Sequence, residues 1–81
     1  MKSVLAPFSS SNIAMQIKNY LLKEYDITST IIPTPKELNL SGCGFCIKTE
    51  YQNASKIIDL VKMLKVNSKG VFDAKTYEKI F

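Results

Sequence analysis

The chain of 81 residues contains no histidine. This absence excludes Ser-His-Asp triads, imidazole general bases and histidine metal ligands. Cysteine is scarce as well, because the chain has only two, whereas a structural zinc site needs four ligands. The sequence therefore predicts no metal centre and no resident cofactor.

The chain also lacks arginine, so its formal charge of +4 depends on lysine alone for its positive groups. The lysines are scattered along the sequence from Lys2 to Lys79. Proteins that bind nucleic acids usually concentrate their basic residues and use arginine heavily. We therefore interpret the lysines mainly as a solvated surface, and we expect no nucleic-acid partner.

No apolar run approaches the roughly 20 residues of a membrane span. Residues 1–8 carry one lysine and lack the long apolar stretch of a secretory signal. We therefore expect the protein in the reducing cytoplasm, without a membrane partner. In that compartment a Cys-x-x-Cys sequence more often binds a metal or takes part in catalysis than forms a structural disulfide.

The hydrophobic pattern predicts one domain over residues 1–81. Strands are expected at residues 3–8, 28–33 and 45–49, a turn with Gly70 and a fourth strand within residues 66–72, and helices at residues 13–25 and 54–64. Asp73 is suited to cap one more helical turn within residues 73–81. The order β-α-β-β-α-β predicts a ferredoxin-like α+β fold, with a four-stranded antiparallel sheet and two helices on one face.

Residues 31–49 hold two of the three prolines, two of the three glycines and both cysteines. Pro33 and Pro35 end the second predicted strand, because proline cannot continue a central strand. About ten residues of loop follow, which is longer than the usual hairpin loop of about 2–5 residues. Loops of this length inside compact domains tend to be functional, so the loop is the candidate site.

This loop contains a motif in two parts. Pro33-Thr-Pro-Lys-Glu-Leu is followed, after a short polar spacer, by Ser41-Gly-Cys-Gly-Phe-Cys-Ile-Lys48. The motif resembles that of a family of small bacterial and archaeal proteins described as selenium/sulfur (Se/S) carrier protein-like. The resemblance covers nearly the whole chain, up to about Asp73.

The resemblance implies specific positions for the family's functional residues. It places the family's cysteine on Cys43, its glycine on Gly44, its proline on Pro35 and its basic residue on Lys36. Lysine stands where arginine is usual, which removes the bidentate fork but keeps the charge. The sequence departs from the family pattern at two further positions, with an asparagine in place of a serine at position 39 and an extra residue at Gly42.

The resemblance also implies a function, that of a carrier or accessory protein rather than an enzyme. Cys43 would bear a persulfide or perselenide, and the partners would be sulfur or selenium donor and acceptor proteins. A thiolate is the nucleophile in such chemistry, so a setting rich in N–H groups or positive charge would help. Gly42 and Gly44 would bring backbone N–H groups close, and Lys36, beside Glu37, or Lys48 would supply the charge.

Each cysteine has a second interpretation. Cys43 shares the strand parity of Phe45 and Ile47, so it could instead pack at the top of the core. If residues 43–49 are extended, the Cα atoms of Cys43 and Cys46 lie about 10 Å apart, beyond the reach of a disulfide, and Cys46 is a small residue on the open sheet face. If the chain turns at Gly44, Cys46 is a candidate resolving thiol for a Cys43 adduct.

Three other function classes stay open. One is a regulatory or scaffold module that binds a partner protein through its sheet face. Another is a Cys-x-x-Cys metal-binding module, although copper chaperones of similar fold carry their pair after the first strand, where this chain has residues 9–12. The third is an RNA-recognition domain, for which Phe45 is the one stacking aromatic present. The open sheet face or an edge strand would also allow a homodimer.

Overall fold

The computed structural model describes residues 2–38, 44–66 and 68–81. The elements follow one another in the predicted order β-α-β-β-α-β, which confirms the α+β fold class. They are β1 (Ser3–Phe8), α1 (Ser11–Tyr25), β2 (Thr30–Pro33), β3 (Phe45–Glu50), a short 3₁₀ helix η1 (Tyr51–Asn53), α2 (Ala54–Leu64) and β4 (Phe72–Asp73).

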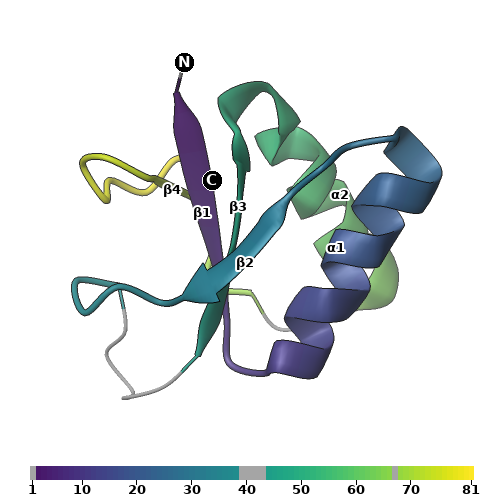
Figure 1. Cartoon of the computed structure of the whole chain (residues 1–81), viewed down its shortest axis with the longest axis horizontal. Helices are drawn as coiled ribbons and strands as arrows, with labels where there is room; N and C mark the ends of the chain where they lie inside the picture. The colour runs from purple at the N-terminus through teal and green to yellow at the C-terminus, as the bar shows by residue number, and fades with distance from the viewer. Residues whose placement is uncertain (1, 39–43, 67) are drawn as a thin grey trace.

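The strands form one antiparallel sheet in the order β2-β3-β1-β4. The centre of the sheet is the pair β1–β3, in which Ala6 lies opposite Ile47. Both helices cover one face of the sheet, as Figure 1 shows. This arrangement is the split βαβ architecture of the ferredoxin-like fold that the sequence predicts.

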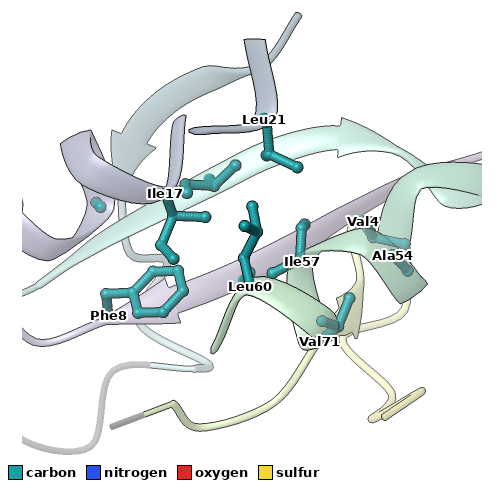
Figure 2. Close-up of a cluster of buried hydrophobic side chains, with 11 residues drawn as sticks. Val4, Phe8, Ile17, Leu21, Ala54, Ile57, Leu60 and Val71 are labelled. Carbon is teal, nitrogen blue, oxygen red and sulfur yellow. The ribbon is translucent and has the colours of Figure 1, made fainter. Parts of the chain in front are cut away.

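The hydrophobic core lies between the sheet and the two helices. Alternate residues of β1 face it, because successive side chains of a strand point to opposite sides. In Figure 2, Phe8 of β1, Ile17 of α1 and Leu60 of α2 point toward one another. The buried cluster comprises Val4, Ala6, Phe8, Ala14, Ile17, Leu21, Ile47, Ala54, Ile57, Leu60 and Val71.

The two helices begin and end at residues suited to those positions. Ser10 caps α1, since its hydroxyl accepts a hydrogen bond of 3.2 Å from the N–H of Asn12. Asp26 and Lys65 end α1 and α2 in the left-handed conformation, with φ of 56° and 55°. Within the described parts of the chain, neither helix is long and apolar enough to cross a membrane.

The fourth strand is short and lies at the end of the stretch in which the sequence predicts it. The pattern indicates a turn with Gly70 and a strand within residues 66–72, and β4 contains Phe72 and Asp73. Before it, Gly70 has φ of 103°, and a side chain there would collide with the carbonyl oxygen of Phe81. Val71 then exchanges backbone hydrogen bonds with the C-terminal residues, donating to the carbonyl oxygen of Phe81 and accepting from the N–H of Ile80.

After β4 the chain makes one turn and comes back. The carboxylate of Asp73 accepts hydrogen bonds from the N–H groups of Lys75 and Thr76, at 2.8 and 3.0 Å. The N–H of Tyr77 donates to the carbonyl of Asp73, and Lys79 then pairs with Phe72. Residues 73–81 therefore contain one turn capped by Asp73, followed by a return strand-like segment instead of a helix.

The sheet face away from the helices is only partly open. Leu5, Pro7 and Cys46 point to this face, yet all three are buried. Figure 1 shows the segment after β2 and the turn after β4 on this side of the sheet. The expectation of a fully open face therefore needs correction, because these two segments project on the side that the helices leave uncovered.

Two neighbouring leucines of α1 allow a direct test of this core. Leu21 is fully buried, whereas Leu22 is 50% exposed. We expect Leu21→Ala to lower the free energy of unfolding by about 2–5 kcal/mol, because it leaves a cavity. Leu22→Ala should change it by less than about 0.5 kcal/mol. Urea denaturation followed by circular dichroism measures both, and equal losses would contradict the described packing.

Candidate functional site

The base of the candidate loop is fixed where β2 and β3 end their pairing. The N–H of Thr34 donates to the carbonyl of Gly44 at 3.1 Å, one step beyond the Pro33–Phe45 pair. A Cβ atom on Gly44 would lie 3.0 Å from the carbonyl oxygen of Phe8 and 3.3 Å from the hydroxyl of Thr34. Gly44 therefore lies close to the backbone of β1, while its predicted role of offering an N–H group to the sulfur of Cys43 stays a prediction.

The first part of the loop forms a single turn. The N–H of Leu38 donates to the carbonyl of Pro35 at 3.0 Å. Lys36 and Glu37, at the middle of this turn, are exposed, and Pro35 is half-buried. The proline thus shapes the loop, while both charged side chains face solvent.

Cys43 and Gly42 lie outside the described residues. Their predicted roles, and the position of Cys43 relative to Lys36, stay predictions from the sequence. What the structure does describe is the residue that directly follows Cys43, namely Gly44, and the hydrogen bond that joins it to Thr34. The chain is therefore anchored one residue after Cys43.

Cys46 belongs to β3 and is extended, as the strand interpretation predicts. It lies opposite Pro7 on β1 and Ile32 on β2, on the face away from the helices. Its side chain is 0% exposed and forms no disulfide. The sequence placed Cys46 on the correct face but expected an open surface there, whereas the residue is enclosed.

The surroundings of Cys46 keep it protonated. Its thiol donates a hydrogen bond of 3.5 Å to the hydroxyl of Thr34. Burial raises the pKa of the Cys46 thiol, and this effect outweighs the hydrogen bond with Thr34 and the positive charge of Lys69, which lower it. A buried neutral thiol is a poor nucleophile, because the thiolate is the reactive form. A role for Cys46 as a resolving thiol stays a prediction, and it would require this site to open.

Thr34 and Lys69 were not among the site residues predicted from the sequence. Thr34 lies inside the motif. Its hydroxyl accepts the hydrogen bond from the Cys46 thiol and also lies next to Gly44, where it would be close to any added Cβ atom. Lys69 comes from the segment after α2, which approaches the end of β1 near Pro7 and Phe8. No local sequence pattern predicts that Lys69 lies near the end of β1, because only the fold brings the two segments together.

Lys48, considered as a charge donor for the loop, faces another part of the sheet. It lies opposite Leu5 in β3, four residues after Gly44. Four residues of extended strand span about 13 Å. Lys48 lines a different cavity, with Lys2 and Asp73. Of the lysines weighed for the loop, only Lys36 lies within the loop itself.

Two alternative site types can be compared with the structure. Phe45, the aromatic expected to stack on RNA, pairs with Phe8 and therefore points to the helix-covered side of the sheet. An RNA-recognition sheet presents its stacking aromatics on the sheet surface that binds RNA. Among residues 2–38, 44–66 and 68–81, no group of three or more cysteine, aspartate or glutamate side chains could hold a metal ion.

The fold and the loop define a class of protein, a small ferredoxin-like α+β domain with a cysteine-containing loop between β2 and β3. The family model described as "Putative Se/S carrier protein-like" matches residues 3–73, from β1 to the end of β4. The chain belongs to this family. No curated protein and no solved structure matches the chain significantly.

The enclosure of Cys46 predicts its reactivity. In a Cys43→Ser variant, Cys46 is the remaining thiol, and we expect it to react with a thiol reagent such as DTNB at least about a hundredfold more slowly in buffer than in denaturant. The converse variant, Cys46→Ala, is the matched control that reports Cys43 alone. Rapid labelling of Cys46 in folded Cys43→Ser protein would contradict the burial described.

The raised pKa of Cys46 also predicts a pH dependence of stability. Below the unfolded-state pKa of about 8.5, both states keep the proton. As the pH rises above that value, the unfolded state ionises first and is stabilised, so the free energy of unfolding falls. Urea denaturation of Cys43→Ser between pH 7 and pH 10, under reductant, should show this fall. The double variant with Cys46→Ala lacks the thiol, and an identical pH profile would contradict the raised pKa.

Proposed function

We propose that this chain carries sulfur or selenium on Cys43, as a persulfide or perselenide, between a donor and an acceptor protein. Two observations support the proposal. The chain belongs to a family described as Se/S carrier protein-like. Of its two cysteines, Cys46 is fully buried and has a raised pKa, which leaves Cys43 as the candidate for exchange.

The burial of Cys46 is the observation that carries the assignment to a residue. A carrier must present its sulfur to two different proteins, and a side chain with 0% exposure cannot meet either of them. Cys43 precedes Gly44, whose carbonyl is tied to Thr34 at the end of the strand pair. A cysteine next to such an anchor would be attached to a rigid support, as functional loop residues usually are.

The transfer itself is a thiol exchange without net oxidation or reduction. The thiolate of Cys43 attacks the terminal sulfur of the donor's persulfide. A new S–S bond forms on Cys43 as the donor's S–S bond breaks, and the donor leaves as a thiolate. The acceptor's thiolate then repeats the same step on the Cys43 persulfide, and a selenium atom would move in the same way.

The reacting form of Cys43 must be the thiolate, since an ordinary cysteine with a pKa of about 8.5 is only partly ionised at neutral pH. Lys36 is the nearest basic residue before Cys43 in the loop, and it is exposed on the turn closed by Pro35 and Leu38. In this proposal Lys36 supplies a positive charge that favours the thiolate.

The test is intact-mass spectrometry after incubation with a cysteine desulfurase and cysteine, and separately with the desulfurase and selenocysteine, from which the desulfurase forms a perselenide that it can hand on. We expect wild type and Cys46→Ala to gain the mass of one chalcogen atom, which a reductant removes. Cys43→Ser should gain none, because it lacks the bearing atom. Lys36→Gln should load more slowly than wild type at neutral pH, and the difference should shrink as the pH rises and more thiolate forms without help.

The matched controls separate this function from its rivals. Cys46→Ala keeps the loop but removes the buried thiol, so loss of loading in this variant would transfer the role to Cys46. If neither cysteine takes up an atom and Cys43 resists thiol reagents in the folded protein, the carrier function is wrong. A scaffold that binds a partner through its sheet face would then be the better description.

A further inference from the structure

A cavity of about 630 Å³ lies at the other end of the sheet from the base of the loop. The start of β1, the strand β3 and the turn after β4 surround it, and Figure 1 shows this turn on the side away from the helices. The lining residues are Lys2, Ser3, Lys48, Asp73, Ala74, Lys75 and Thr76. Lys48, the last residue of the motif, belongs to this lining, but the proposed transfer does not use the cavity.

Three ammonium groups and one carboxylate line the cavity, which gives it a net charge of +2. Across the described parts of the chain, Lys2, Lys48 and Lys75 make no ion pair with a carboxylate. Lys2 lies over the ring of Tyr51, with its Nζ 5.8 Å from the ring centre. The charge of Lys2 also lowers the pKa of Asp73, so Lys48 and Lys75 are the two lysines of the described lining that remain available for a ligand.

Asp73, the one acidic residue of the lining, forms hydrogen bonds within the turn that follows β4. Asp73 accepts hydrogen bonds from the N–H groups of Lys75 and Thr76, and these bonds lower its pKa, so it is ionised at neutral pH. Glu50 is also close to Lys2, but together they line a neighbouring cavity of about 220 Å³. The larger cavity thus keeps its excess of positive charge.

The chemistry of the lining selects a class of ligand. Lysine ammonium groups and the hydroxyl of Ser3 are hydrogen-bond donors that suit phosphate oxygens, whereas the hydroxyl of Thr76 already interacts with Asp73. A phosphate monoester carries about −1.5 to −2 charges at pH 7, which matches the net charge of the lining. A cavity of about 630 Å³ lies within the usual range for small-molecule sites, about 300–1,000 Å³, and exceeds the needs of a bare phosphate ion.

We infer that this cavity, bounded by Lys2, Lys48 and Lys75, binds a small organic phosphate monoester. Lys2, Lys48 and Lys75 come from three chain segments that border one hollow, whereas an acidic peptide would need a series of basic groups along a groove. The inference stands apart from the proposed transfer on Cys43, because the two regions occupy opposite ends of β3. Either one can be wrong without affecting the other.

The test is an NMR titration of the ¹⁵N-labelled full chain with ribose 5-phosphate, at low ionic strength. We expect saturable shifts of the amides of Ser3, Lys48 and Thr76, and weaker binding to inorganic phosphate, which lacks the organic group. Removal of two charges in Lys48→Gln/Lys75→Gln should weaken binding of ribose 5-phosphate at least about tenfold. Lys65→Gln, at the exposed end of α2, is the control and should leave the affinity unchanged.

Other outcomes overturn the inference. Equal affinity for inorganic phosphate would show that the cavity takes only a bare anion. An equal loss of affinity for ribose 5-phosphate in Lys65→Gln would show that binding depends only on the net charge of the protein. Binding of a glutamate-rich peptide without binding of ribose 5-phosphate would assign the surface to a protein partner. The NMR spectrum of each variant shows directly whether the fold is retained, so a failure to bind cannot be mistaken for unfolding.

Discussion

The pairing of β1 with β3 is the interaction on which the rest of the structure depends. It runs from Ser3–Glu50 to Phe8–Phe45 and fixes which side chains face the helices. With Ala6 and Ile47 turned toward the core, Cys46 and Lys48 must point to the other face, because a strand alternates its side chains. One register therefore buries the core, encloses one cysteine and presents a lysine to the basic cavity.

Most of the fold could be predicted from local pattern. The periodicity of Ile17 and Leu21 and the proline pair after Ile32 identify elements through their own residues, and the structure confirms the element order. The bounds of β4 could not be predicted in this way. The sequence indicates a turn and a strand within residues 66–72, but the backbone of Val71 forms its hydrogen bonds with Ile80 and Phe81, which a local pattern does not reveal.

The candidate site likewise has features that a local sequence pattern predicts and features that depend on the whole fold. The turn from Pro35 to Leu38 follows from proline chemistry, so the sequence indicates it, whereas the approach of Gly44 to the carbonyl of Phe8 depends on the pairing of β1 with β3. The approach of Lys69 depends on a segment that arrives after α2, and the enclosure of Cys46 depends on packing over the second face. Such contacts are properties of the whole fold, and no single stretch of sequence contains them.

The enclosure of Cys46 has a consequence for the lifetime of any sulfur held on the neighbouring loop. An accessible second thiol would attack a persulfide within its own chain, close a disulfide and expel hydrogen sulfide. A thiol that is 0% exposed and held protonated is prevented from doing so while the domain stays folded. A chain with two cysteines would thus hold a persulfide as stably as a chain with one. The rate at which hydrogen sulfide is lost would depend on how often β3 opens and exposes Cys46.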